Sequence, residues 1–490
     1  MSIAGARGGV QGVGRRVRPR PLLVPAAASL VLAAIVWAVA APARFVNYDT
    51  EYALLWGHDL VHGRTPDYSV AFAPTPHPLA ELLGAIGSLV SVGFGEGLFE
   101  VVAFLALGIL GWLTFALGRA WFGTAAGVVA AAIVLTREPI LSYGIRAYVD
   151  IPYICLLLGG LLLETRRRRA GTPVLVLFAL AGLLRPEAWL FAAAYAAWLW
   201  RGGALRPIHV VLVVGAPVLW ALSDLAITGD PLHSLTGTRS TAEDLGRITG
   251  LEHVPTTLPR RLGEILREPV LFGAVVGGVL TLWRLRSRAV LGAVAGVLAV
   301  GAFCLLAAAG LSILTRYLLL PAVILALFCG AGVAGWTALA RDDRWRTRWM
   351  ALSALTVLLL VAFIPSQVTR LHNTRSALIT QTHILDELHA LAPATKGLTC
   401  SIQLPNRRAV PQLALWTGRR PRDIRSAQEQ RTYAFPAFIP TSQETADQFV
   451  LDARDKDRVL PPPPGDAVAP DDRGRYWLLY DGCPSSAPAP

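Results

Sequence analysis

The sequence has little charge for its length. Only 16% of its 490 residues are charged, whereas 54% are hydrophobic, and the mean hydropathy is +0.49. An ordinary soluble domain has about 25% charged residues. Because so much apolar surface cannot all be buried inside a soluble fold, most of it must face lipid. The composition therefore excludes a soluble protein for most of this chain.

The sequence also lacks the short motifs of several enzyme and transporter classes. It contains no Walker A loop, no His-Glu-x-x-His metalloprotease motif, no clustered Cys/His zinc pattern and no Gly-x-Ser-x-Gly nucleophile elbow. Nothing in it indicates nucleotide-driven transport. A net charge of +12 would suggest nucleic acid as the partner of a soluble protein. Here the arginines lie between apolar runs, where the positive-inside rule explains them, so we exclude nucleic acid.

Apolar runs that are long enough to cross a bilayer recur along the chain. A span needs roughly 20 mostly apolar residues, because the hydrocarbon core is about 30 Å thick and a helix rises about 1.5 Å per residue. We predict an all-α polytopic membrane protein with about eleven transmembrane helices. The predicted spans are residues 21–42, 98–118, 122–141, 149–164, 172–185, 187–200, 207–228, 269–284, 289–310, 317–339 and 349–365.

The arginines between these runs set the predicted orientation. They lie at Arg119, 166–169, Arg201, Arg206, 284–288 and 341–348. If the further apolar run His77–Phe94 crossed the membrane, all of these arginines would lie outside. If that run lies along the surface or re-enters the membrane, they all face the cytoplasm with the basic N-terminus, as the positive-inside rule requires. We therefore predict that His77–Phe94 is an interfacial helix.

This orientation divides the chain into three parts. We predict a cytoplasmic N-terminus at 1–20, a transmembrane domain at 21–365 with external loops 43–97 and 229–268, and an external domain at 366–490. The protein would be a multi-pass protein of the plasma membrane.

The external domain is predicted from a change of composition. After residue 366 the chain becomes polar and rich in proline, and the alternating stretch Tyr476–Tyr480 suggests a strand, so we expect a small α/β domain. Cys400 and Cys483 lie in it. On the oxidising side of a membrane these two cysteines can form a disulfide, and the alternative is a pair of free thiols.

Two carboxylates follow the first predicted helix at once. Asp49 and Glu51 lie two residues apart just beyond the membrane exit. Such a pair can act as a general base, orient a hydroxyl group, or bind a hard divalent cation such as Mg²⁺ or Mn²⁺. The alternative is that both are solvated charges at a helix end.

A second group of charged residues interrupts the apolar runs further along the chain. Asp150 enters an apolar helix, and a carboxylate there is costly unless it is paired or faces a wet cavity. Arg146 lies four residues earlier and can share its helix face, so a purely structural ion pair is the alternative. The break Arg185-Pro186-Glu187 is predicted to be a hinge with an internal ion pair.

Several short motifs follow one another in order. They are Asp49-Thr50-Glu51, the Gly63–Pro66 turn, His77-Pro78-Leu79, the Leu117–Gly123 turn, the Ser142–Asp150 segment and Thr315-Arg316-Tyr317 with Pro321. This series resembles the polytopic glycosyltransferases of the GT-C fold, especially the branch that includes protein O-mannosyltransferases and lipid A aminoarabinose transferases. The resemblance covers about residues 20–340 and does not include the C-terminal domain.

The resemblance implies a GT-C-like module with a long first external loop. It also implies transfer of a sugar from a polyprenyl-phosphate donor to a glycan, lipid or protein acceptor on the external face. In that reading Asp49 is the general base and Glu51 positions the acceptor or a metal ion, with inversion at the anomeric carbon.

The leaving group of this reaction would be a lipid phosphate, which cationic groups stabilise. Arg316 and Tyr317 are the first candidates to bind it. The further candidates are His77, Arg146, Asp150 and Arg185.

A second class of function stays open at this point. The protein could be a secondary transporter or a non-catalytic lipid-handling membrane protein. Transporters commonly show paired repeats and broken helices near the bilayer midplane. This sequence shows no convincing repeat, and its acidic residues concentrate at the predicted external edge, which favours the enzyme.

Overall fold

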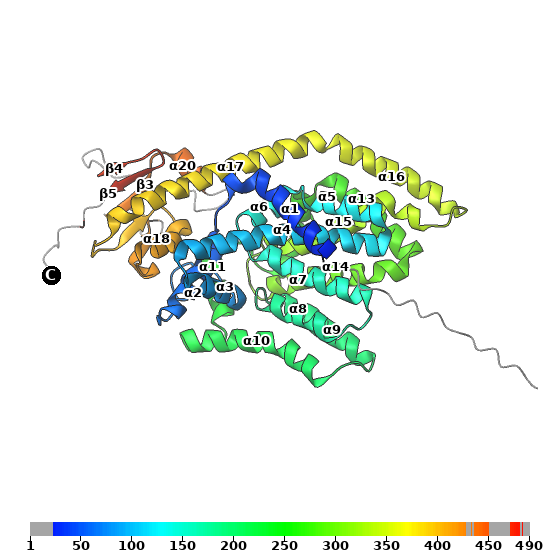
Figure 1. Ribbon diagram of the computed structural model, residues 1–490, viewed down its shortest axis with the longest axis horizontal. Helices are drawn as coiled ribbons and strands as arrows, with labels where there is room; N and C mark the ends of the chain where they lie inside the picture. Colours follow the sequence, from blue (N-terminus) through cyan, green and yellow to red (C-terminus); the bar gives the residue numbers. More distant parts are fainter. Residues whose placement is uncertain (1–22, 428–432, 434–435, 450–470, 481–482, 484–490) are drawn as a thin grey trace, which may run out of the picture.

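The structure is a helical bundle with a small mixed domain at one end (Figure 1). It is a computed structural model that describes residues 23–427, 433, 436–449, 471–480 and 483. The predicted cytoplasmic segment 1–20 lies outside the described residues.

Helices form where the sequence predicts spans. The bundle consists of α1 (Leu23–Ala40), α4 (Val92–Phe122), α5 (Thr124–Val134), α6 (Glu138–Ile145), α7 (Asp150–Arg166), α8 (Thr172–Gly182), α9 (Ala188–Arg201), α10 (Pro207–Thr228), α13 (Glu268–Arg284), α14 (Arg286–Ala308), α15 (Leu319–Ala334) and α16 (Arg344–Ala362). The short 3-10 turns η1 (Ala41–Ala43), η3 (Thr315–Leu318) and η4 (Gly335–Ala338) extend α1 and α15.

Six helical segments of the described chain are long and apolar enough to cross a membrane. They include the 31-residue Val92–Phe122 and the almost fully buried Thr315–Ala338. Two bent pairs raise the number to eight: α5 with α6, bent by 64°, and α12 (Val254–Leu266), entered through η2 (Leu251–His253), with α13, bent by 107°. The protein is therefore a multi-pass membrane protein.

The predicted number of eleven spans is not confirmed. Helices α8 and α9 have 11 and 14 residues. At about 1.5 Å per residue they are roughly 17 and 21 Å long, which is shorter than the hydrocarbon core. Helix α5 also has 11 residues, because the predicted span 122–141 is broken between Val134 and Glu138.

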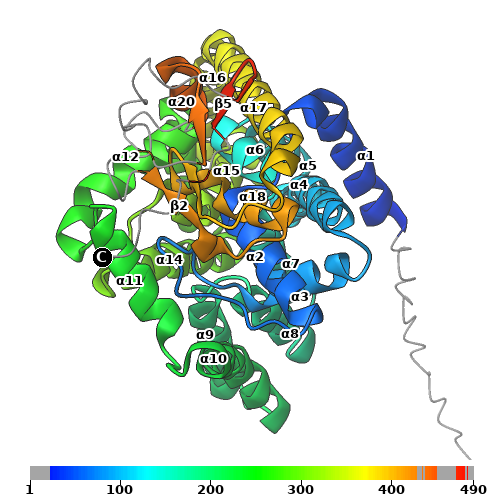
Figure 2. The ribbon, with the colours of Figure 1, turned by 90° about the vertical axis from the view of Figure 1, so that its left-hand side faces the viewer.

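A layer of short helices lies at one end of the bundle, where the long loops are predicted. It contains α2 (Tyr48–Val61), α3 (Pro78–Ser88), α11 (His233–Asp244) and α12. The predicted interfacial helix His77–Phe94 is shorter than expected, since Ser91 caps a new helix by accepting a hydrogen bond from the backbone N–H of Phe94. Helices α2 and α3 lie side by side (Figure 2).

The C-terminal domain begins without a linker. The boundary that we predict at residue 366 falls in the first turn of α17 (Ile364–Leu391), a 28-residue helix that runs from the bundle to the domain (Figure 1). The domain contains a five-stranded sheet in the order β2-β1-β3-β5-β4, in which β1 is parallel to β2 and β3 whereas β5 is antiparallel to β3 and β4. Its elements are β1 (Ile402–Leu404), η6 (Arg407–Ala409), α18 (Val410–Thr417), β2 (Ile424–Ser426), β3 (Ala437–Pro440), α20 (Gln443–Phe449), β4 (Asp472–Arg473) and β5 (Trp477–Tyr480).

Several contacts fix this domain against the bundle. Glu387 of α17 accepts hydrogen bonds from the backbone N–H groups of Tyr476 and Trp477, at 2.8 and 2.9 Å. Helix α18 packs on α2, and Trp416 donates a hydrogen bond to Glu96 of α4 at 3.0 Å. Cys400 and Cys483 form a disulfide, which resolves the alternative left open by the sequence.

Close helix packing in the bundle depends on glycine, which gives a direct test of the fold. A Cβ atom on Gly277 of α13 would lie 1.8 Å from the carbonyl oxygen of Phe328 in α15, whereas a Cβ atom on Gly278 would meet nothing within 4 Å. We expect Gly277→Ala to destabilise the protein by about 1–3 kcal/mol, because the two helices must separate. Gly278→Ala, in the same helix, is the matched control. Equal melting temperatures of the two variants in detergent would contradict this packing.

Candidate active site

Four of the predicted site residues meet in one cavity at the edge of the bundle. The cavity has a volume of about 600 Å³ and lies between α2, the α6–α7 turn, α11, η3, α17 and η6. Asp49, Arg146, Arg316 and Tyr317 line it. Its size is typical of a small-molecule binding site.

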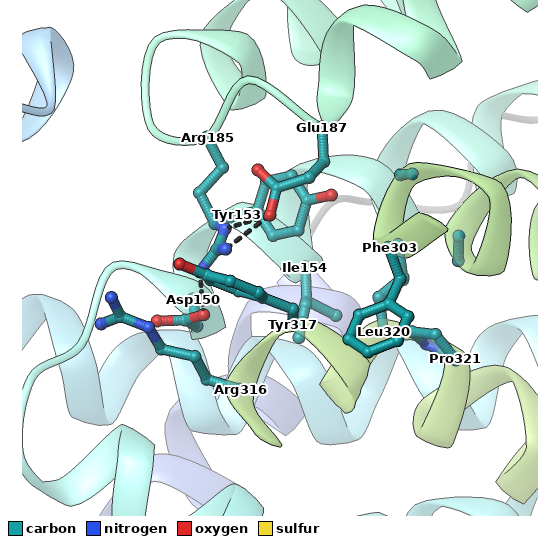
Figure 3. Close-up of a pocket in the computed structure, with 12 residues that line it drawn as sticks. Asp150, Tyr153, Ile154, Arg185, Glu187, Phe303, Arg316, Tyr317, Leu320 and Pro321 are labelled. Carbon is teal, nitrogen blue, oxygen red and sulfur yellow. Dashed lines mark hydrogen bonds and ion pairs between the residues drawn. The ribbon is translucent and has the colours of Figure 1, made fainter. Parts of the chain in front are cut away.

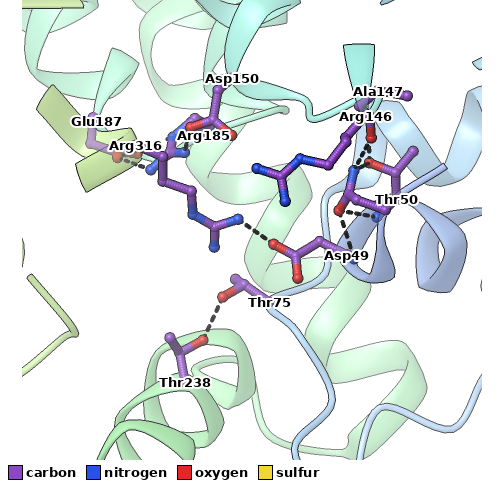
Figure 4. A network of polar contacts seen from close by, with 11 residues as sticks. Asp49, Thr50, Thr75, Arg146, Ala147, Asp150, Arg185, Glu187, Thr238 and Arg316 are labelled. Carbon is purple, nitrogen blue, oxygen red and sulfur yellow. Dashed lines mark hydrogen bonds and ion pairs between the residues drawn. The ribbon is translucent and has the colours of Figure 1, made fainter. Parts of the chain in front are cut away.

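The first turn of α2 is held against the turn between α6 and α7. Asn47 caps α2 by accepting hydrogen bonds from the backbone N–H groups of Asp49 and Thr50, at 2.9 and 3.3 Å. Its side-chain amide donates to the carbonyl oxygen of Arg146 at 2.8 Å, and the Thr50 hydroxyl donates to that of Ala147 at 2.7 Å. This arrangement directs the Asp49 carboxylate toward the cavity (Figure 4).

Asp49 forms an ion pair with Arg316, which lies in η3 before α15 (Figure 4). Both side chains are partly accessible, with 15% and 18% of their surface exposed. Burial alone would raise the pKa of Asp49, but the Arg316 guanidinium outweighs burial and holds that pKa below its ordinary value. The carboxylate is therefore ionised at neutral pH.

Tyrosine rings surround the arginines of the cavity. The Arg316 guanidinium lies 5.7 Å from the ring centre of Tyr148 and 5.5 Å from that of Tyr317. Arg146 lies 5.1 Å from the Tyr148 ring and 5.4 Å from the Tyr143 ring. Such cation–π contacts help to keep the guanidinium groups in place. Arg146 also donates its Nε–H to the carbonyl oxygen of Ser142 at 3.1 Å.

Asp150 does not use Arg146 as its partner, contrary to one reading of the sequence. It pairs instead with Arg185, which also pairs with Glu187 at 2.5 Å (Figure 3). The ion pair predicted inside the Arg185-Pro186-Glu187 break is thus confirmed. The Arg185 guanidinium lies 4.4 Å from the ring centre of Tyr317.

This buried triad lines a small enclosed space of about 10 Å³, behind the large cavity. Arg316 and Tyr317 line both spaces. Asp150 and Arg185 therefore lie beside Arg316 and Tyr317, on the side of these residues that faces the small space.

His77 is not among the described residues that line the large cavity. It occupies the position just before the first turn of α3, is 8% exposed, and lies edge-on to Trp220 with ring centres 6.0 Å apart. Burial, together with the charge of Arg185, lowers the pKa of His77 to about 3. The imidazole is therefore neutral at neutral pH in this arrangement.

Glu51 is also separated from Asp49. Residues two apart on a helix are about 200° apart around its axis, so the two carboxylates face opposite sides. Glu51 is 1% exposed, and its Oε1 atom has no hydrogen-bond partner among the described residues. Burial and the neighbouring Glu96 raise the pKa of Glu51 well above its ordinary value.

The predicted metal site at Asp49 and Glu51 does not fit this arrangement. The two carboxylates do not converge, and Asp49 is already paired with Arg316. Among the described residues no group of three or more His, Cys, Asp or Glu side chains is placed to hold a metal ion. We therefore derive no step through a metal.

Sequence reasoning missed four cationic residues of the cavity. One of them, Arg261 of α12, pairs with Glu264 at 2.7 Å. Arg247 follows α11, and Arg407 and Arg408 lie in η6 of the C-terminal domain. Burial lowers the pKa of Arg247, and the charges of Arg407, Arg316 and Arg408 lower it further. No local signal in a polar loop and a polar tail could have assigned these residues to the cavity.

The arrangement of the helices defines the class of the protein: it has the GT-C fold. The chain is similar to the crystal structure of ArnT from Cupriavidus metallidurans bound to undecaprenyl phosphate, with a TM-score of 0.51 and 13% identity over 86% of this chain and 93% of that chain. The same ArnT in the apo state gives a TM-score of 0.51 and 14% identity, covering 80% and 84% of the two chains.

At this level of identity the similarity shows the fold alone. No protein-family model matches the sequence, and no curated protein matches it either.

The triad behind the cavity gives a test of its structural role. Arg185→Leu leaves the carboxylates of Asp150 and Glu187 buried without their counter-charge, and breaking a buried pair costs about 3–5 kcal/mol. We expect a large loss of thermal stability in detergent. Arg201→Leu, at the exposed end of α9, is the control for loss of one arginine and should melt like the parent. A stable Arg185→Leu variant would refute this role.

Proposed function

We propose that this protein is a membrane glycosyltransferase that moves a sugar from a polyprenyl-phosphate donor to a glycan, lipid or protein acceptor at the external face. The observation that carries the proposal is the accessible Asp49 carboxylate beside Arg316 and Arg146 in one cavity. Sugar transfer from a lipid phosphate needs both a base and a cationic site for the leaving group. The similarity to a structure that contains undecaprenyl phosphate supports the class of donor.

The Asp49–Arg316 pair suggests how donor binding activates the base. Arg316 has a buried Nε–H without a partner among the described residues, and its guanidinium can pair with two oxygens of a phosphate. When the donor phosphate pairs with Arg316, Asp49 loses its counter-charge and the pKa of Asp49 rises. The carboxylate then becomes a better acceptor for the proton of an attacking hydroxyl group.

The reaction follows from these positions. The acceptor oxygen bonds to the anomeric carbon, its proton passes to Asp49, and the bond from that carbon to the phosphate oxygen breaks. The lipid phosphate leaves with the bonding electrons and is stabilised by Arg316 and Arg146. Attack on the face opposite the leaving group inverts the anomeric carbon.

The proposed orientation places the N-terminus in the cytoplasm and the cavity with the C-terminal domain outside the plasma membrane. The Cys400–Cys483 disulfide supports it, because such bonds persist in oxidising compartments. The positive-inside arrangement of the arginines supports the same orientation.

The separation of the two carboxylates gives the first test of the reaction. We expect Asp49→Asn to lower transfer of labelled sugar from a polyprenyl-phosphate donor by about 10²- to 10⁴-fold, since general base catalysis is worth that much. Glu51→Gln, which imitates the protonated acid, should keep activity near that of the parent. Loss of activity in both variants would indicate that Asp49 and Glu51 act together in catalysis. No transfer by the parent across a broad panel of donors and acceptors would favour the transporter or lipid-handling alternative.

The ion pair also predicts how activity depends on pH. Asp49 must be deprotonated to act as a base, so kcat/KM falls as the pH drops through its pKa. Arg316 holds this pKa below its ordinary value. In Arg316→Gln the pKa rises, and the acidic limb of the kcat/KM profile should move to higher pH. Arg316→Lys keeps the charge and should show a smaller displacement. Identical acidic limbs in the two variants would exclude Asp49 as the titrating base.

A further inference from the structure

The large cavity receives a hydroxyl group from the loop that precedes α3. Residues 72–75 of this loop line the cavity together with Asp49. The Tyr48 hydroxyl donates a hydrogen bond to the carbonyl oxygen of Phe72 at 2.6 Å. Because Tyr48 directly precedes Asp49 in α2, this hydrogen bond holds the loop beside the proposed base.

The backbone conformation of this loop is restrained at two positions. Phe72 has a φ of 61°, in the left-handed region that an aromatic residue rarely adopts. Residues in such conformations cluster at functional sites. Thr75 stands between Pro74 and Pro76, and a residue that precedes proline is confined to extended conformations. The loop therefore presents the Thr75 side chain to the cavity in a defined position.

The Thr75 hydroxyl belongs to a chain of two short hydrogen bonds that ends on α11. Its Oγ atom lies 2.6 Å from the Oγ atom of Thr238 (Figure 4), which in turn lies 2.6 Å from the carbonyl oxygen of Ser234. Two oxygen atoms at this distance need a proton between them. A carbonyl oxygen carries no proton, so the single proton of the Thr238 hydroxyl goes to Ser234. The Thr75 hydroxyl must therefore be the donor in its contact with Thr238.

This direction leaves Thr75 as a hydrogen-bond acceptor toward the cavity. A hydroxyl group has one proton and two lone pairs. The Thr75 proton is used toward Thr238, and among the described residues the Oγ atom of Thr75 has no other hydrogen bond. The ionised Asp49 carboxylate, which lines the same cavity, is also an acceptor. A ligand that satisfies both groups must donate two hydrogen bonds, as a sugar with several hydroxyl groups can.

We propose that Thr75 accepts a hydrogen bond from a sugar hydroxyl group, while Asp49 accepts the proton of the attacking hydroxyl group. Thr75 is then a residue that determines substrate specificity. This inference rests on the proposed function. The sugar hydroxyl comes from one of two sources: an acceptor that carries more than one hydroxyl group, or the sugar of the donor. In both cases a substrate without this hydroxyl group leaves Thr75 unpaired and binds less well.

Steady-state transfer by the full-length protein in detergent tests this role, with the donor and the acceptor that the parent uses. Thr75→Val removes the acceptor oxygen, whereas Thr75→Ser keeps it. Thr238→Val breaks the same hydrogen bond between the loop and α11 but leaves the Thr75 oxygen in place. Thr236→Val, at an exposed position of α11 outside the described lining, is the surface control.

We expect Thr75→Val to raise KM for one substrate about 3- to 10-fold, which corresponds to the loss of one neutral hydrogen bond. The substrate whose KM rises, donor or acceptor, identifies the source of the hydroxyl group. Thr75→Ser should keep the KM of the parent, and Thr238→Val should raise KM less than Thr75→Val. The surface control should behave like the parent. Equal increases in Thr75→Val and Thr238→Val would mean that Thr75 only connects the loop to α11, which overturns the proposal.

Analogues of that substrate that each lack one hydroxyl group complete the test. With the parent protein one analogue should lose the same factor in kcat/KM that Thr75→Val loses with the full substrate. That analogue should lose nothing further with Thr75→Val, because the two changes remove the same hydrogen bond. The proposal is refuted if every analogue loses as much with Thr75→Val as it does with the parent.

Absence of transfer by the parent would be a different result, since it contradicts the proposed function. Equilibrium binding of polyprenyl-phosphate mannose, bare polyprenyl phosphate and free mannose would then decide the role of Thr75. If Thr75 binds a sugar hydroxyl group, Thr75→Val weakens at least one of the two mannose ligands and leaves binding of the bare lipid phosphate unchanged. Equal binding of both mannose ligands to the parent and to Thr75→Val would exclude this role.

Discussion

The site depends on the contact between the start of α2 and the turn that joins α6 to α7. The Asn47 side-chain amide donates a hydrogen bond to the carbonyl oxygen of Arg146, and the Thr50 hydroxyl donates one to that of Ala147. Ala147 has a positive φ of 56°, which turns the chain so that its carbonyl and that of Arg146 face α2. These bonds connect residues about a hundred positions apart in the sequence. They bring a carboxylate and an arginine into one cavity at the edge of the bundle.

The charges near this cavity are organised as two connected groups. The inner group, Asp150 with Arg185 and Glu187, is buried, and its two carboxylates share the one guanidinium. The outer group, Asp49 with Arg316, is partly accessible. Tyr317 lies between them, since its ring contacts the guanidinium groups of both Arg185 and Arg316. A rigid inner group can hold the outer one in position, while the outer pair remains free to exchange partners with a ligand.

The C-terminal domain is part of the site and not an appendage. Helix α17 carries the chain out of the bundle, Glu387 fixes β5 to that helix, and α18 packs against α2. The cavity is therefore closed on one side by a folded domain that is further constrained by a disulfide. A change in the docking of this domain would move Arg407 and Arg408 relative to Asp49 and so change the shape of the cavity.

The sequence by itself determined the membrane class, the positions of most helices, the fold family and the segments that contribute Asp49, Arg316 and Tyr317. These features depend on composition, on runs of apolar residues and on short ordered motifs, all of which are local. The tertiary structure alone decided that Glu51 faces away from Asp49, that Asp150 pairs with Arg185, and that helices as short as α8 occur where full spans were expected. It also decided that Arg247, Arg407 and Arg408 belong to the cavity. The physical reason is that ion pairs and cavity walls are formed by side chains from distant segments, whose approach is set by packing.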